Sequence, residues 1–128
     1  MELNDITAEI VDAAMKVHSA LGPGLLESAY KTCMAFELRK RGLKVETEVT
    51  VPIVYDGMII DVGYRMDLLI ESEVVAELKA VSEIIPIFKA QLLSHLKLAN
   101  KRVGLLINFH VERLKDGGIV RMVNKFQD

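Results

Sequence analysis

The chain has 128 residues and a formal net charge of −2, so it is long enough for one folded domain but short for two. Hydrophobic residues make up 51% of it and charged residues 27%, a balance that excludes an intrinsically disordered protein. The small negative charge argues against a large nonspecific nucleic-acid footprint, but it does not exclude a local basic groove around an acidic site.

Membrane and secretion signals are missing from the sequence pattern. No apolar run approaches the roughly 20 residues of a membrane span, and the opening MELNDITAEI lacks the basic and apolar regions of a signal peptide. Cys33 is the only cysteine, which excludes an intrachain disulfide and favours a small core residue over a catalytic thiol. We therefore expect a cytoplasmic protein with no membrane segment, in which residues 1–128 form a single domain.

Two helices are predicted at the start of the chain. Apolar residues recur at three- and four-residue steps across residues 4–21, and Gly22 provides a stop. The turn Gly22-Pro23-Gly24 leads into a second helix that begins near residue 25 and is closed by Gly42. His18 lies one position off the main apolar stripe, which favours a partly buried surface histidine over an active-site role.

Glu27 falls in the first turn of the second helix, and its position has two interpretations. A glutamate there interacts favourably with the helix dipole and the free N–H groups, and it precedes Lys31 by four residues, a common helical ion pair. The alternative is a functional acid. Local sequence by itself favours the structural interpretation.

Three strands are expected next. Residues 44–55 alternate and are rich in β-branched side chains, and Asp56-Gly57 is a turn signal. Residues 58–70 should form a second strand, bent at Gly63, and residues 74–80 a third.

The last third of the chain predicts a helix and two more strands. The helix begins at Ser82 or Glu83, ends near Asn100 and has Pro86 in its first turn. The apolar run at 103–109 is typical of a strand buried on both faces, and residues 119–123 form a short final strand. The order α-α-β-β-β-α-β-β predicts an α/β fold of the three-layer sandwich type with a central mixed sheet.

The hairpin formed by the second and third strands carries polar groups on an apolar sheet. If Ser72 is the midpoint of its turn, Asp67 faces Glu77, and Lys79 lies on the same face. Two opposed carboxylates repel each other, and a divalent cation between them would turn this cost into a binding site. The alternative is a solvated polar edge with Asp67 paired to Arg65. A one-residue shift of the turn would separate the two acids.

Five segments of the chain resemble a known family. Gly24 to Tyr30, GLLESAY, fits the signature of the GxxExxY family, small proteins placed in the PD-(D/E)XK nuclease superfamily. The segments YRMDLLI, VVAELKA, QLLSHLKL and VGLLINF follow in the matching order and spacing. This resemblance extends over nearly the whole chain and implies a restriction-endonuclease-like core.

The resemblance also implies roles for five residues. Asp67 matches the motif acid on the second core strand, and Glu77-Leu78-Lys79 matches the (D/E)-X-K on the third. Glu27 matches an acidic residue on the preceding helix, and Gln91 a glutamine on the following helix. The usual tyrosine four residues later is His95 here, and Met66 precedes Asp67 in place of the proline.

In the implied chemistry, Asp67, Glu77 and Glu27 hold Mg²⁺ (or Mn²⁺), which stabilises phosphoryl charge and activates a water molecule. Lys79 positions this water or stabilises the anionic transition state, and Gln91 orients a carboxylate, a water or a phosphate.

The implied function is that of a metal-dependent nuclease that hydrolyses nucleic-acid phosphodiester bonds, with DNA favoured over RNA. The alternative is a non-catalytic nucleic-acid-binding or scaffold module that retains the fold. Because so small a domain offers little surface for duplex DNA, a homo-oligomer or a larger complex could supply specificity.

Overall fold

The structure is a computed structural model, and it describes residues 1–125. The helices are α1 (Leu3–Leu21), α2 (Glu27–Lys40) and α3 (Pro86–Ala99). The strands are β1 (Val45–Thr50), β2 (Ile53–Tyr55), β3 (Met58–Ile60), β4 (Arg65–Ile70), β5 (Val74–Lys79), β6 (Val103–Asn108) and β7 (Ile119–Val123). Within the described residues, no helix is both long enough and apolar enough to cross a membrane.

Five strands form one mixed sheet in the order β1-β4-β5-β6-β7. The β5–β6 pair is parallel and is connected by α3, while the other neighbours are antiparallel. Strand β6 is buried along its whole length, as its apolar sequence predicts. The predicted central mixed sheet is therefore confirmed.

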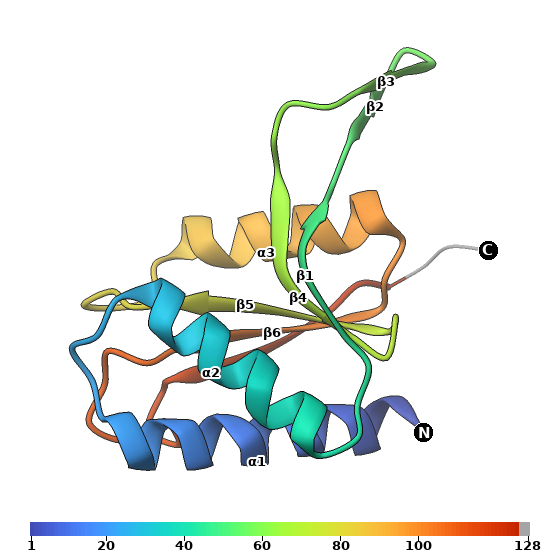
Figure 1. Cartoon of the computed structure of the whole chain (residues 1–128). Coiled ribbons are helices and arrows are strands. Elements are labelled where there is room, and N and C mark those ends of the chain that lie inside the picture. Colours follow the sequence, from blue (N-terminus) through green and yellow to red (C-terminus); the bar gives the residue numbers. More distant parts are fainter. Residues whose placement is uncertain (126–128) are drawn as a thin grey trace.

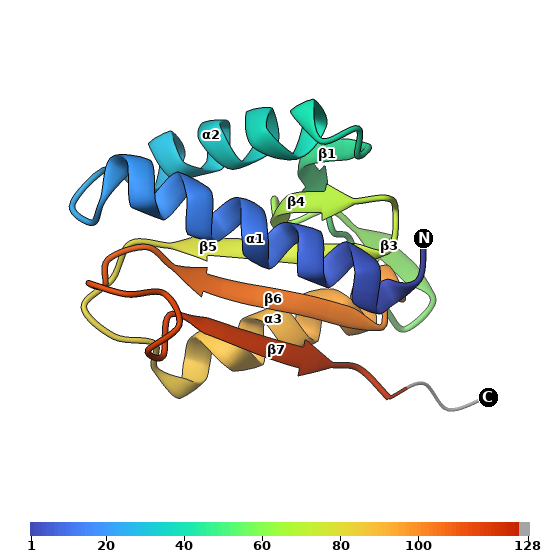
Figure 2. The same cartoon turned by 90° about the horizontal axis from the view of Figure 1, so that it is seen from below.

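Helices α1 and α2 cover one face of this sheet and α3 covers the other, so the body has three layers (Figures 1 and 2). Alternate residues of the strands fill two separate cores. The core under α1 and α2 includes Ile10, Leu68 and Ile107, and the core under α3 includes Leu69 and Val75. This arrangement confirms the predicted α/β fold class.

Close contact between α3 and the sheet depends on Gly104 in β6. A Cβ atom at this position would lie 2.8 Å from Cδ1 of Leu92 on α3, well inside normal contact distance. The missing side chain allows the buried Leu92 to pack directly against the β6 backbone.

Two predicted strands are each broken in the structure, so their boundaries were wrong. The segment 44–55 splits into β1 and β2 around Pro52, which has no N–H to donate to a ladder. The segment 58–70 splits into β3 and β4, and Gly63 between them has a φ of 86°. The bend expected at Gly63 is in fact a full interruption.

Because of these interruptions, a two-stranded hairpin is separate from the main sheet. Strands β2 and β3 pair only as a separate small sheet, which projects beyond the layer of α3 (Figure 1). Asp56 and Gly57 at its tip have φ values of 51° and 77°, as in the two-residue turn that their sequence predicts. Residues 53–64 are called the arm below.

Tyr30 fixes the loop that leads into α2. Its hydroxyl donates a hydrogen bond to the Gly22 carbonyl oxygen (2.6 Å) and accepts one from the Leu25 N–H (3.1 Å). Its fully buried ring stacks on Phe109 with a centroid distance of 4.4 Å. Helix α2 consequently begins at Glu27, two residues later than predicted, with this glutamate at a defined position.

We expect Tyr30→Phe to lower the free energy of unfolding by roughly 1–2 kcal/mol, because both loop hydrogen bonds are lost while the stacked ring remains. Urea denaturation measures the change. Phe36→Ala on the same helix is the control, since Phe36 is 68% exposed and its loss should cost no more than about 0.5 kcal/mol. Equal stability of Tyr30→Phe and the wild type would contradict this account.

Candidate active site

The candidate site lies where β4 and β5 stop pairing. Residues Leu68 to Ile70 pair with Val74 to Ala76 in the register centred on Ser72, so the predicted register is confirmed. One step further, the backbone N–H of Asp67 donates to Oε2 of Glu77 (3.2 Å). The N–H of Leu78 in turn donates to Oδ2 of Asp67 (2.8 Å). Each acid thus takes a backbone hydrogen bond from the opposite strand, and both carboxylates are held at one point.

Lys31 of α2 neutralises Asp67. Its Nζ lies 3.2 Å from Oδ1 of Asp67 and also forms an ion pair with Glu48 of β1. Burial lowers the pKa of Lys31, but the hydrogen bond that Lys31 donates to Glu48 and the charge of Asp67 outweigh this effect, so the pKa is raised. The polar-edge alternative, in which Asp67 pairs with Arg65, is therefore wrong.

His95 of α3 contacts the second acid of the hairpin. Its Nδ1 lies 2.6 Å from Oε1 of Glu77, which is a hydrogen bond if Nδ1 carries the proton. Glu77 is only 8% exposed, so it does not belong to a solvated edge. Burial raises the pKa of Glu77, and the contact with His95 offsets part of that increase.

Glu27 stands at the first position of α2 and faces the same acids. Burial, followed by the charge of Asp67, raises its pKa, while Lys79 and Lys31 act in the opposite direction. The predicted helical pair between Glu27 and Lys31 is replaced by the bonds of Lys31 to Asp67 and Glu48.

Lys79 extends toward α3, where its Nζ lies 4.8 Å from the centre of the Phe88 ring. Within residues 1–125 it forms no ion pair. The aromatic face partly compensates its charge and leaves its N–H donors available for another acceptor.

A cavity of about 120 Å³ brings these groups together. All five sequence-predicted site residues line it, and so does His95. Its lining residues are Glu27, Arg65, Asp67, Glu77, Lys79, Phe88, Gln91, Leu92, His95 and Leu106. Gln91 is exposed at its rim. Lys31 is the one site residue that the sequence interpretation missed, and its only signal was its place one helical turn after Glu27.

His18 and Cys33 do not belong to this site. The Nε2 of His18 lies 2.8 Å from the Val111 carbonyl oxygen, and its ring lies beside Phe109. Cys33 is partly buried and packs against the core under α1 and α2. Both have structural roles, as their sequence positions predict.

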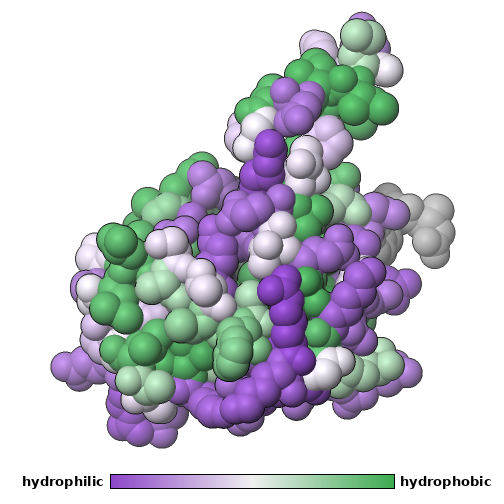
Figure 3. Space-filling view, viewed as in Figure 1, coloured by the Kyte–Doolittle hydropathy of each residue, from purple (hydrophilic) through white to green (hydrophobic). Residues whose placement is uncertain are grey.

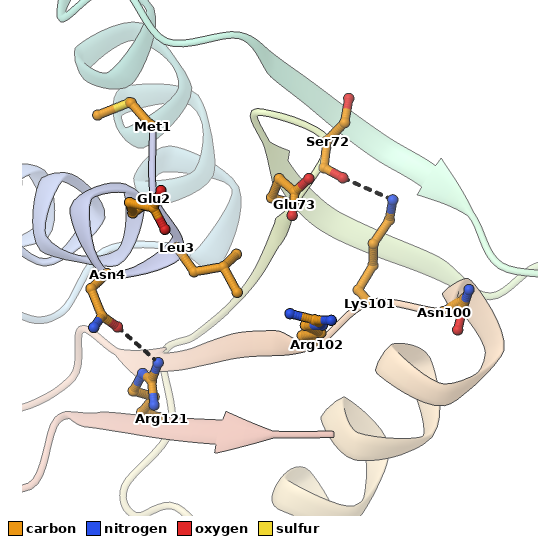
Figure 4. A pocket seen from close by; sticks show the side chains of 10 residues that line it. All are labelled: Met1, Glu2, Leu3, Asn4, Ser72, Glu73, Asn100, Lys101, Arg102 and Arg121. Atoms are coloured by element: carbon orange, nitrogen blue, oxygen red, sulfur yellow. Dashed lines mark hydrogen bonds between the residues drawn. The ribbon is translucent and has the colours of Figure 1, made fainter. Parts of the chain in front are cut away.

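A larger cavity of about 640 Å³ opens at the other end of the β4–β5 hairpin (Figure 4). Lys101 donates there to the Ser72 carbonyl oxygen (2.8 Å), and Arg121 donates to Oδ1 of Asn4 (3.2 Å). Glu2 and Glu73 line it as well, so its charges are mixed. None of the five sequence-predicted site residues lines it.

The donor set around the smaller cavity fits a hard divalent cation by its chemistry. Three carboxylates face one small space, and the pKa of both Glu27 and Glu77 is raised, the condition that a bound cation would relieve. The set is not preassembled, because among residues 1–125 no three acidic, histidine or cysteine side chains are close enough to hold an ion. Cation binding therefore requires the carboxylates to move closer together.

Two comparisons place this fold among known proteins. A family model described as the PD-(D/E)XK nuclease superfamily matches residues 4–122. The crystal structure of SSO0001 is similar with a TM-score of 0.58 and 20% sequence identity, over 97% of this chain and 61% of the other. This chain therefore spans about three fifths of SSO0001, and at this identity the likeness concerns the fold. No curated protein matches the chain.

The raised pKa of Glu77 leads to a prediction for the protein kept free of divalent cations. A group whose pKa is higher in the folded state contributes stability below its unfolded value, near 4.5, and that contribution is lost as the pH rises through the folded value. Glu77→Gln removes the titrating group. We therefore expect the free energy of unfolding to fall less steeply above pH 4.5 in Glu77→Gln than in the wild type.

Urea denaturation in EDTA at a series of pH values tests this expectation. The matched control is Glu112→Gln, which changes an exposed loop glutamate in the same way. If Glu77→Gln and the wild type show the same pH dependence of unfolding, the inferred environment of Glu77 is wrong.

Proposed function

The chain belongs to the PD-(D/E)XK nuclease superfamily, and we propose that it is a metal-dependent nuclease that hydrolyses nucleic-acid phosphodiester bonds, with DNA favoured over RNA as the substrate. One observation carries the proposal. Asp67, Glu77 and Lys79 meet Glu27 and Gln91 in a single cavity at the point where β4 and β5 separate.

In this proposal Asp67, Glu77 and Glu27 hold Mg²⁺ or Mn²⁺. Such a cation would neutralise phosphoryl charge and make a bound water acidic enough to attack near neutral pH. The crossed hydrogen bonds from the Asp67 and Leu78 N–H groups fix one oxygen of each hairpin acid. These two oxygens are held before a ligand binds, which limits part of the entropic cost, although the three carboxylates must still move closer together to hold the cation.

Lys79 acts on the substrate rather than on the acids. Because its Nζ rests over the Phe88 ring and forms no ion pair within the described residues, it can donate to an attacking water or to a phosphate oxygen. Gln91 at the cavity rim orients the same water or phosphate through its amide.

Lys31 and His95 balance the hairpin acids when no cation is bound. Lys31 holds Oδ1 of Asp67, and His95 contacts Oε1 of Glu77. Both contacts compete with a cation for these oxygens. We expect Lys31 to move toward Glu48 alone when a cation binds, since that ion pair already exists.

We propose that residues 1–128 form one cytoplasmic domain and that the chain falls within the GxxExxY family, whose signature includes Glu27 and Tyr30. Tyr30 would serve the site by anchoring the loop that places Glu27.

A non-catalytic nucleic-acid-binding or scaffold module is the second candidate, and a specific observation favours it. The carboxylates are not assembled for an ion within residues 1–125, and an internal lysine and histidine already satisfy two of their oxygens. A module that keeps the fold without the chemistry would need no more than this.

Thermal unfolding with and without Mn²⁺ tests the metal site directly. At about 100 times the dissociation constant, the cation should stabilise the wild type by about 2.7 kcal/mol. Asp67→Asn should lose this response and still fold, because the side chain keeps its size and one acceptor oxygen. Glu112→Gln, at an exposed position, should respond as the wild type does. An unchanged melting temperature in the wild type would overturn the metal site.

Cleavage assays distinguish the enzyme from the module. Single- and double-stranded DNA and RNA are incubated with Mg²⁺ or Mn²⁺, and we expect cleavage that falls at least about 100-fold in Lys79→Ala. Lys115→Ala removes an exposed loop lysine and should retain full activity. Metal-dependent stabilisation without cleavage of any substrate would favour the module instead.

A further inference from the structure

The arm carries an apolar surface that no other part of the described chain covers. Every residue from 54 to 64 is exposed. The large apolar side chains among them are Val54, Tyr55, Met58, Ile59, Ile60, Val62 and Tyr64. Figure 3 shows a group of hydrophobic residues exposed on the projecting arm, with a few hydrophilic residues among them.

The extent of this surface matches that of one side of a protein–protein interface. Tyr55 is 72% exposed and Ile59 75%. With roughly 200 Å² for each fully exposed large side chain, the seven residues present about 800 Å². This total is divided between the two faces of the hairpin, since Val54 and Ile59 share one face and Tyr55 and Met58 the other. It equals the share that one partner contributes to a standard interface. An isolated two-stranded hairpin is also only marginally stable in water. We therefore expect the apolar side chains of the arm to be buried against a partner.

A groove that is also mainly apolar lies between the base of the arm and α3. Its volume is about 680 Å³. Its apolar lining comes from Ile53, Tyr64, Ile87, Ala90 and Leu98. Arg65 and Lys97 add positive charge to the lining.

The charges of the arm complement those of the groove. Asp56 and Asp61 are the only charged residues in segment 53–64, so the arm is acidic as well as apolar. Asp61 already lies 3.7 Å from Arg65 of the same chain, while Asp56 at the exposed tip has no ion pair within residues 1–125. An acidic apolar hairpin is unsuited to a nucleic-acid backbone but suits an apolar groove that carries cations.

We propose that a second copy of the chain provides the cover, with the arm of each copy lying in the groove of the other. Such a reciprocal exchange satisfies two-fold symmetry and buries both apolar surfaces at once. Gln91 and His95 line both the groove and the cavity of the candidate site, so the partner's arm would lie beside that site. The dimer does not depend on whether the site is catalytic.

Sedimentation velocity over a concentration series tests the exchange in the full chain. Ile59→Asp disables the arm and Ile87→Asp disables the groove. Both positions are exposed, at 75% and 54%, so the variants should fold. We expect each change to raise the dimer dissociation constant at least about tenfold. Phe36→Asp on the far side of the sheet, 68% exposed, should leave the dissociation constant unchanged.

Mixing the two variants gives the sharper result. The intact arm of Ile87→Asp fits the intact groove of Ile59→Asp, so the mixture should form heterodimers although neither variant dimerises well alone. A mixture that stays monomeric would overturn the arm-in-groove geometry. A wild type that is monomeric at its highest soluble concentration would overturn the dimer, as would an unaffected Ile59→Asp. A monomer that pellets with phosphatidylcholine–phosphatidylglycerol vesicles through Ile59 would assign the arm to a lipid surface and overturn the proposal.

Discussion

Two crossed hydrogen bonds between β4 and β5 determine the form of the candidate site. Strand pairing ends at Leu68 and Ala76, and beyond this point side chains replace the backbone as acceptors. Glu77 accepts from the Asp67 N–H, and Asp67 accepts from the Leu78 N–H. The backbone groups freed where the strands separate are thereby satisfied, and two acids are oriented by the same bonds. Without this exchange, two nearby carboxylates would repel and the strand ends would expose unpaired donors.

The remaining features of the site offset the cost of bringing acids together. Glu27 adds a third carboxylate, and its pKa is raised by burial and by Asp67. Lys31 from α2 contacts Asp67, and His95 from α3 contacts Glu77. Each helical layer therefore provides a partner for one of the two hairpin acids. Two of the carboxylate oxygens are therefore occupied by internal partners without a ligand, while the pKa of both Glu27 and Glu77 stays raised. A ligand must bind more strongly than these internal partners.

The features of the fold and site that depend on short-range sequence patterns could be predicted from the sequence. The register of the hairpin follows from the turn at Ser72, and the turn at the arm tip follows from Asp56-Gly57. The sequence predicted the strands on both sides of Pro52 and Gly63 as continuous, because β-branched residues persist through the interruptions. Pro52 and Gly63 mark the two positions, but whether each produces a bend or a full break depends on which strands lie alongside. Lys31 could not be assigned for a similar reason. Its pairing with Asp67 and Glu48 depends on how α2 lies against the sheet, whereas helical spacing alone favoured Glu27.

The absent side chain at Gly104 has a consequence for the size of the candidate site. Leu92 fills the space above this glycine and is also part of the cavity wall. A methyl group at position 104 would displace the Leu92 side chain, which lines the cavity together with Glu77 and His95. The volume of the cavity thus depends on Gly104, a residue that is not part of the cavity lining. A substitution at Gly104 would therefore change the volume of the site while every acidic group stays unchanged.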